Sequence, residues 1–238
     1  MVSKVIAALS YKGGVGKSTI LSSLAYALRK ETHLRVVYVD STADGLGSSM
    51  LAPGCRVEYG TYAFLGGVDA LQMCTVEADG ALVDALPPGP MPNAPLRGER
   101  LRELLQTLRL EYNAIFLDLP GTDEDHSDVI RAAIEAADIY VIVAEPATVQ
   151  LAYNLRQKLP EKPVIAVLNK YVDGHPGRHE IGVIGTSRWG KHGYVIPFEG
   201  PVFNAVVSRT LPVTLRGVKF VQVIDQIGAA LQRLLLQA

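Results

Sequence analysis

The residues of this chain whose types and spacing suit chemistry begin with the glycine-rich run SYKGGVGKST at positions 10–19. Glycine accepts positive φ, so successive N–H groups of such a run can converge on one anion. A helix that starts directly behind the run adds the positive end of its dipole. The Lys17 ammonium can reach the β- and γ-phosphates of a nucleotide, and the Ser18 hydroxyl can ligate Mg²⁺. The backbone of this cradle comes from Gly13, Gly14, Val15, Gly16 and Thr19. We therefore predict a site for ATP with Mg²⁺.

Two carboxylates that could serve the metal follow apolar runs. Asp40 ends the run RVVYVD at 35–40, and Asp118 ends the run AIFLD at 114–118. Both runs are typical of buried strands, and ligands of open α/β sheets bind at the carboxyl ends of the strands. Mg²⁺ keeps several of its waters and is usually held by one or two carboxylates. We expect Asp40 and Asp118, together with Ser18, at the metal.

The phosphate-binding run departs from the general pattern, which has glycine where Tyr11 stands. A second lysine, Lys12, directly precedes Gly13, and this form resembles the deviant Walker A sequence of the ParA/MinD family of P-loop ATPases. The resemblance implies a nitrogenase-iron-protein-like fold in which two subunits sandwich two ATP molecules, with Lys12 of each completing the site of the other. It also implies catalytic roles for Lys12 and Lys17. Asp118 is then linked to Mg²⁺, and the N–H of Gly121 faces the γ-phosphate.

The loop after Asp40 departs from the same family. Its members usually carry a second aspartate two residues after the first, where it orients the attacking water, and Thr42 stands there in this chain. Asp44 lies two residues further on, so we assign the water-orienting role to Asp44. Because phosphoryl transfer depends on positioning, a displaced group costs rate more than binding. We expect slow hydrolysis, and a switch without hydrolysis stays an alternative.

Two residues resemble the adenine pocket of these ATPases. Asn169 ends the apolar run 164–169, as the base-reading asparagine of the family does, and an amide offers an adenine edge both a donor and an acceptor. Pro197, in the sequence IPF at 196–198, matches the end-of-domain pattern of the family. We expect both residues at the base of ATP.

Strands alternating with helices must position these groups. Runs that are apolar throughout predict a mostly parallel sheet in an α/β fold, with helices on both faces. We predict strands over 2–9, 35–40, 81–86, 114–118, 139–144, 164–169 and 194–197. We predict helices over 20–28, 99–110, 128–137, 148–159, 201–208 and 218–236, and short helical turns over 61–65 and 68–74. Loops are predicted over 41–54 and 87–95, and residues 173–190 have no assignment.

Length and composition favour one domain over residues 1–238. Hydrophobic residues make up 48% of the chain and charged residues 20%, which excludes a disordered protein. The net charge of −1 gives no general attraction to nucleic acid, so DNA binding requires a local patch. Neither a transmembrane-length apolar stretch nor a signal-peptide pattern is present, so we expect a cytoplasmic protein.

The cysteines and histidines predict no metal site. Cys55 and Cys74 lack Cys-x-x-Cys spacing, so we interpret them as buried or incidental thiols of a reducing compartment. This argues against the iron–sulfur carrier branch of the family. His175 and His179 have helical spacing, but a proline and a glycine stand between them. The other histidines, His33, His126 and His192, complete no ligand set.

Basic residues gather in the C-terminal third, namely Arg178, Arg188, Lys191, Arg209, Arg216 and Lys219. In ParA-like dimers this region forms a surface for non-specific DNA, although an ordinary solvated surface explains the residues equally well. Trp189 and Tyr194 lie among them and could stack on bases or simply pack. Residues 231–238 carry Arg233 as their only cation, so no stable membrane association is expected.

The resemblance as a whole implies a DNA-partition ATPase, cytoplasmic or associated with the nucleoid. It would form a homodimer with ATP, bind non-specific DNA and recognise a ParB-like or other centromere-binding adaptor. Two alternatives stay open. One is a nucleotide-gated dimerisation switch with little or no hydrolysis, and the other is a MinD-like ATPase that positions a cargo at a membrane.

Overall fold

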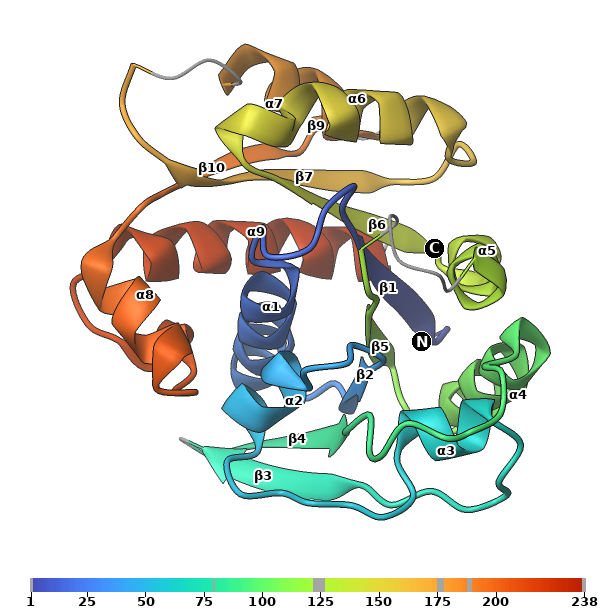
Figure 1. Ribbon diagram of the computed structural model, residues 1–238. Helices are drawn as coiled ribbons and strands as arrows, with labels where there is room; N and C mark the ends of the chain where they lie inside the picture. The colour runs from blue at the N-terminus through green and yellow to red at the C-terminus, as the bar shows by residue number, and fades with distance from the viewer. Residues whose placement is uncertain (1, 79, 122–126, 175–177, 188–189, 237–238) are drawn as a thin grey trace.

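The centre of the computed structural model, which describes residues 2–78, 80–121, 127–174, 178–187 and 190–236, is an eight-stranded sheet in the order β10-β7-β6-β1-β5-β2-β4-β3 (Figure 1). Every neighbouring pair of strands is parallel except β3 and β4, so the prediction of a mostly parallel sheet is confirmed. The strands are β1 (Lys4–Leu9), β2 (Val36–Asp40), β3 (Cys74–Ala78), β4 (Ala81–Leu86), β5 (Ala114–Asp118), β6 (Ile139–Ala144), β7 (Val164–Tyr171) and β10 (Gly193–Pro197).

Helices cover both faces of the sheet (Figure 1). One face carries α1 (Lys17–Glu31), α2 (Leu46–Leu51) and α9 (Lys219–Leu236), and the other carries α4 (Gly98–Arg109), α5 (Ser127–Ala136), α6 (Val149–Lys158) and α7 (Arg178–Ile184). The remaining helical pieces are α3 (Thr61–Leu65), α8 (Gly200–Val207) and the 3₁₀ turns η1 (Pro146–Thr148) and η2 (Pro212–Thr214). The two faces bury separate apolar clusters, with the sheet between them.

The central strands are apolar throughout because each is covered twice. In β1, Ile6 and Ala8 belong to the cluster under α1 and α9, while Val5, Ala7 and Leu9 belong to the cluster under α4 and α5. Successive side chains of a strand point to opposite faces, so a strand between two helical layers needs apolar residues at both sets of positions. β1 lies between β5 and β6, which places the run that follows it at the middle of the carboxyl edge.

Two sequence predictions are wrong in this half of the chain. Residues 41–54 are not all loop, because α2 occupies Leu46–Leu51. Residues 68–74 form no helical turn, because α3 ends before Gly66 and residues 68–73 have no regular structure until β3 begins at Cys74. The N–H of Gln72 donates to the carbonyl oxygen of Tyr59 at 2.8 Å, a contact outside any helix.

The cysteines are joined rather than unpaired. Cys55 and Cys74 form a disulfide, with their Cα atoms 6.2 Å apart, an ordinary separation for such a bond. The bond ties the segment after α2 to the start of the edge strand β3. The prediction of two buried or incidental thiols is therefore wrong, since the fold brings together two cysteines that are 19 positions apart.

The stretch without an assignment, 173–190, contains α7 and the strand β8 (Thr186–Ser187), which pairs with β9 (Gly190–Lys191) in a separate two-stranded ribbon. Several residues singled out in the sequence lie outside the described residues: His126, His175, Arg188 and Trp189.

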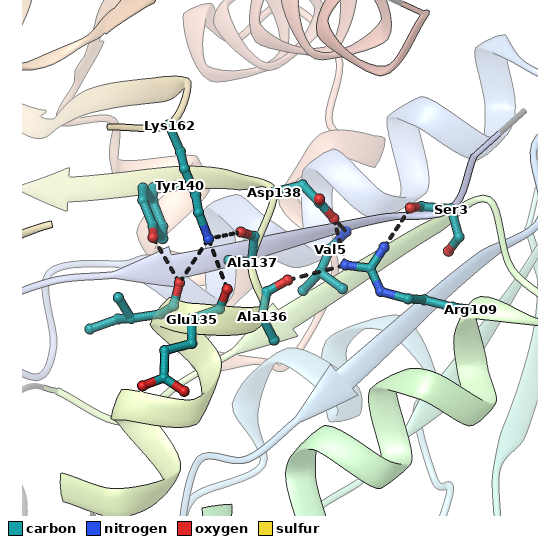
Figure 2. Close-up of polar contacts among 10 residues, drawn as sticks. Ser3, Val5, Arg109, Glu135, Ala136, Ala137, Asp138, Tyr140 and Lys162 are labelled. Carbon is teal, nitrogen blue, oxygen red and sulfur yellow. Dashed lines mark hydrogen bonds and ion pairs between the residues drawn. The ribbon is translucent and has the colours of Figure 1, made fainter. Parts of the chain in front are cut away.

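A polar network joins elements at the amino ends of the central strands (Figure 2). The Lys162 ammonium donates to the carbonyl oxygens of Glu135 and Ala137 at 2.8 and 2.6 Å, and to that of Ile134 at 3.3 Å. These carbonyls lie at and just beyond the C-terminus of α5, where helical carbonyls lack partners within the helix. A cation is favourable there because it also opposes the helix dipole.

Arg109, at the end of α4, closes the same region (Figure 2). Its guanidinium donates to the carbonyl oxygen of Ser3 at 2.6 Å, to that of Ala136 at 3.1 Å and to Asp138 Oδ2 at 2.7 Å. The same carboxylate oxygen accepts the N–H of Val5 at 2.8 Å. The network thus fastens α4, α5 and β1 at the edge opposite the glycine-rich run.

Candidate functional site

The glycine-rich run links β1 to α1 in a conformation that only glycine adopts easily. Gly14 has φ 78° and Gly16 has φ 96°, both in the left-handed region. Gly16 also lacks room for a side chain, since a Cβ there would lie 2.2 Å from Asn169 Nδ2. Gly16 is the N-cap of α1 and provides no side-chain cap, so the first N–H groups of this helix stay open to an anion.

Lys17 is held inside this loop. Its side chain is 6% exposed, and its Nζ donates to Ser10 Oγ at 2.9 Å. Ser10 Oγ in turn donates to the carbonyl oxygen of Lys12 at 2.7 Å. A buried ammonium between a strand end and a helix start suits a phosphate, which is a stronger partner than a neutral hydroxyl. The Lys12 residue is exposed, as a lysine that acts on another molecule has to be.

Two neighbouring residues at the end of β7 hold the outer side of the run. Asn169 Nδ2 donates to the carbonyl oxygen of Val15 at 2.8 Å, and Lys170 Nζ donates to that of Gly14 at 2.7 Å. Lys170 also forms an ion pair with Glu145 at 2.6 Å and has φ 53°, a strained value for a lysine. With its carbonyls bonded away from the site, the run is free to turn its N–H groups toward a ligand.

The two strand-end aspartates lie side by side. Asp40 on β2 is in register with Asp118 on β5, which is in register with Ala8 near the end of β1. Both aspartates are fully buried. Burial, followed by the nearby charge of Asp40, raises the pKa of Asp118 to about 7, while Ser18, Tyr38 and Lys17 act in the opposite direction. Burial likewise raises the pKa of Asp40, against hydrogen bonds from Thr42 and Ser48.

The two aspartates differ in their partners. Asp118 Oδ2 accepts the hydroxyl of Tyr38 at 2.6 Å, but Asp118 Oδ1 is one of the few buried side-chain oxygens without a partner in the described residues. Asp40 is fully engaged by its own loop, because Oδ1 accepts the N–H and hydroxyl of Thr42 and Oδ2 accepts the N–H of Ser48. Asp40 therefore fastens α2, and Asp118 presents the open oxygen.

These residues fit a magnesium–nucleotide complex. A buried carboxylate with a raised pKa and an oxygen without a partner is the group that a cation would satisfy, and Ser18 stands at the start of α1 beside it. Within the described residues no set of three or more His, Cys, Asp or Glu side chains is arranged to hold a metal ion. A single open carboxylate oxygen beside a serine hydroxyl suits a metal that keeps several waters and arrives with phosphates.

The other predicted residues are spread along the same edge. Asp44 is exposed, and its Oδ1 accepts the N–H of Leu46 at 3.2 Å and lies 3.0 Å from the hydroxyl of Thr42. Gly121 is buried three residues beyond the end of β5. Pro197 lines a cavity of about 470 Å³ with Tyr171 and Phe198, and Asn169 is not among the residues around it. The structure therefore places Asn169 against the phosphate-binding run. Pro197 lies on the neighbouring strand β10, in register with Tyr171, which is two residues after Asn169 on β7.

Sequence reasoning missed Tyr38, Ser10 and Lys170. A tyrosine inside the aliphatic run 36–39 was a usable signal, because a buried hydroxyl needs a partner. Lys170 directly follows Asn169, but its contact with Gly14 joins residues 156 positions apart. No local sequence pattern predicts a contact between residues so far apart in the chain.

Comparison with known proteins finds a matching family model and solved structures with a similar fold. Residues 6–213 match the family model described as the CobQ/CobB/MinD/ParA nucleotide binding domain. The fold is similar to that of the septum site-determining protein MinD complexed with Mg-ADP from Pyrococcus horikoshii OT3, with a TM-score of 0.74, 19% identity and coverage of 98% of this chain and 97% of that one. It is also similar to pNOB8 ParA bound to nonspecific DNA, with a TM-score of 0.61, 17% identity and coverage of 99% of both chains.

A curated sequence relative belongs to a different branch. The cytosolic Fe-S cluster assembly factor CFD1 of Mycosarcoma maydis is 26% identical over 213 residues, which cover 81% of this chain. The match takes in 57% of that relative, so this chain spans a little more than half of its length.

Proposed function

Because this chain belongs to the CobQ/CobB/MinD/ParA family of nucleotide-binding domains, we propose that it is a ParA-like ATPase that acts as a single domain over residues 1–238. The observation that carries the proposal is the joint presence, at one edge of the sheet, of the phosphate-binding run with its buried Lys17 and the partly open carboxylate of Asp118. The solved structure of a relative with Mg-ADP supports the choice of ligand.

In this proposal the residues of the chain divide the work. The N–H groups of residues 13–19 and the Lys17 ammonium bind the phosphates, and Lys12 reaches the nucleotide of a second copy. Ser18 and Asp118 would hold Mg²⁺, with Asp40 behind them through water, and the metal supplies charge neutralisation at the β- and γ-phosphates. Gly121 lies beside the γ-phosphate, and Asn169 keeps its amide oxygen for the adenine while its nitrogen holds Val15. Pro197 closes the base side.

Calorimetry of ATP binding tests this site. Lys17→Ala should lose most of the ATP affinity, because it removes the buried cation of the phosphate-binding run. Lys158→Ala is the matched control, since Lys158 is an exposed lysine in the last turn of α6 and should bind as wild type does. Equal affinities for wild type and Lys17→Ala would remove the assignment.

Dimerisation is the second part of the proposal. An exposed Lys12 that completes the site of a second copy predicts that Lys12→Ala binds ATP but does not form the ATP-dependent dimer. Light scattering with ATP and Mg²⁺ measures this directly. A variant that dimerises and hydrolyses ATP as wild type does would assign Lys12 to the solvated surface.

The partner that we propose for the dimer is non-specific DNA, with release on hydrolysis and a ParB-like or other centromere-binding adaptor as the specific partner. The exposed cations Arg178, Arg216 and Lys219 and the solved structure of a ParA on nonspecific DNA support it. The place of action would be the cytoplasm, at the nucleoid. Because disulfides are rare in the reducing cytoplasm, thiol labelling of protein taken directly from cells tests this location: reduced Cys55 and Cys74 agree with it, and an intact bond contradicts it.

A non-hydrolysing dimerisation switch is the second candidate, and the contacts of Asp44 favour it. Its Oδ1 is engaged within its own loop, and the resemblance to ParA-like ATPases implies a water-orienting aspartate where Thr42 stands. If Asp44 orients the attacking water, Asp44→Ala should hydrolyse ATP more slowly than wild type with unchanged ATP affinity. No turnover by wild type with DNA and adaptor present would make the switch the better account.

Iron–sulfur cluster assembly lacks support in the described residues. The printed name of the curated relative concerns Fe-S cluster assembly, but the two cysteines of this chain are bonded to each other. We do not propose that role for this chain.

Among the described residues, no helix combines the length and the apolarity that a membrane crossing requires.

A further inference from the structure

Tyr38 lies in an unusual place for a polar side chain. It is the only residue of β2 before Asp40 that is not valine, and its side chain is fully buried under α1 and α2. Its register partner on β5 is Phe116, two residues before Asp118, so Tyr38 and Asp118 rise from the same face of the sheet. The hydroxyl reaches along that face and donates to Asp118 Oδ2 at 2.6 Å.

Packing requirements do not explain the hydroxyl. An apolar ring would fill the same space in the cluster under α1, and a buried hydroxyl without a partner would destabilise the fold. The Tyr38 hydroxyl has its partner in Asp118 Oδ2, to which it donates at 2.6 Å. The feature that distinguishes tyrosine from phenylalanine here is therefore its bond to Asp118.

Helix α2 also packs against the Tyr38 hydroxyl. A Cβ at Gly47 would lie 1.7 Å from the Tyr38 hydroxyl oxygen and 2.5 Å from its Cζ, so the helix backbone packs directly against the phenol. The hydroxyl is confined between Gly47 and the carboxylate. Since one oxygen of Asp118 is fixed by this donor, the rotation of the carboxyl group is fixed as well, and its second oxygen stays open.

We propose that Tyr38 is a positioning residue that sets the Asp118 carboxylate for the Mg²⁺ of the bound nucleotide, an inference that rests on the proposed function. Hydrogen-bond partners of metal-linked carboxylates typically contribute 10- to 100-fold to metal affinity. Because Gly47 belongs to the segment that Asp40 fastens, the same contact couples the position of α2 to the metal site.

The test compares ADP affinity by calorimetry with Mg²⁺ and with EDTA. Tyr38→Phe should bind ADP without Mg²⁺ as wild type does, while the gain in affinity on adding Mg²⁺ should fall by about tenfold. Gly47→Ala keeps the hydroxyl but pushes against it, and should reduce the same gain. Tyr140→Phe is the matched control, since it deletes a buried hydroxyl of β6 that donates to the carbonyl oxygen of Ile134 in the opposite-edge network.

The outcomes are distinct. A smaller Mg²⁺-dependent gain in Tyr38→Phe and not in Tyr140→Phe supports the role, even if both variants lose thermal stability. A wild-type gain in Tyr38→Phe overturns it and leaves the nucleotide site intact. Wild-type protein that does not bind ADP with Mg²⁺ overturns the proposed function and this inference together.

Discussion

The Thr42 hydroxyl lies between two carboxylates, Asp40 at the end of β2 and Asp44 in the loop that follows. Thr42 Oγ1 lies 2.6 Å from Asp40 Oδ1 and 3.0 Å from Asp44 Oδ1, and a hydroxyl donates to one acceptor at a time. The shorter contact favours Asp40, which leaves Asp44 with the N–H of Leu46. An aspartate at position 42 would put three carboxylates within this loop, so threonine also lowers repulsion in the protein without nucleotide.

His192 gives a pH-dependent prediction far from the nucleotide site. Burial and the nearby Arg233 lower the pKa of His192 from its ordinary value. The folded protein then keeps His192 neutral where the unfolded chain binds a proton, so the free energy of unfolding falls as pH drops through about 6.5 toward the lower folded pKa. Chemical denaturation at pH 7 and pH 5 should show a smaller loss in His192→Gln.

The control for this variant is His179→Gln, because His179 is exposed on α7. It should keep the pH dependence of wild type. A His192→Gln variant with the full loss between pH 7 and pH 5 would assign that loss to other groups.

For single residues, the sequence predicts which side chains lie at the candidate site but not which residues they bond to. Lys17, Ser18, Asp40, Asp118 and Asn169 can be placed at one edge, because each stands at a strand end or a helix start. The bond from Tyr38 to Asp118 spans 80 positions, and the one from Asn169 to Val15 spans 154. Such contacts follow from strand order, and local patterns do not determine strand order.

Among the elements, α5 shows how a helix end is stabilised by a distant residue. Lys162→Met should lower the free energy of unfolding by about 1–3 kcal/mol, because three carbonyl oxygens lose a charged donor. Urea denaturation measures the loss. ADP affinity should stay at the wild-type value, because the network lies at the amino ends of the strands and the phosphate-binding run follows the carboxyl end of β1.

Lys158→Met is the control, since it changes an exposed lysine on the helix that precedes the same loop. Equal stabilities for both variants would show that the contacts of Lys162 contribute nothing.

The edge strand β3 depends on the disulfide as well as on β4. Cys74→Ser should lower the free energy of unfolding by about 3 kcal/mol under oxidising conditions, since the bond closes a loop between residues 19 positions apart. A reducing agent should bring wild type to the stability of the variant. If the reducing agent leaves the wild-type denaturation midpoint unchanged, the bond is absent or without effect.

The elements that the sequence mispredicts share a physical cause. Residues 46–51 and 68–78 have weak local patterns, and their structure depends on contacts with other segments: Asp40 with Ser48, Cys55 with Cys74, and the pairing of β3 with β4. The strongly apolar strands and the long helices α1, α4 and α9 appear within a few residues of their predicted ends.

Over the whole molecule, the C-terminal region contacts the nucleotide edge through Arg209. This residue has φ 52° and donates to Ser49 Oγ of α2 at 2.8 Å, so it is not a free surface cation. A change at Arg209 would alter α2 and DNA contacts together. The proposed DNA surface is therefore better tested with Arg216 and Lys219, which are exposed.

Arg216→Glu combined with Lys219→Glu should abolish retention of duplex DNA by the ATP-bound protein and leave dimerisation intact. Retention by wild type should fall steeply with salt and ignore DNA sequence, because phosphate contacts release counterions. Lys158→Glu, at a distant exposed position on α6, is the control for charge alone. Wild type that retains no duplex at low salt would exclude the DNA partner.

The hydrogen bonds from Asn169 and Lys170 to the phosphate-binding run also affect when that run can fold during synthesis. The run leaves the ribosome early, but its Val15 carbonyl is held by Asn169 and its Gly14 carbonyl by Lys170, both far along the chain. β1, which precedes the run, pairs with β5 and β6. A nascent chain that ends before residue 169 already contains β1, β5 and β6 but lacks both donors, so its phosphate-binding run is not yet held from outside. We therefore expect tight nucleotide binding only after most of the chain has been synthesised.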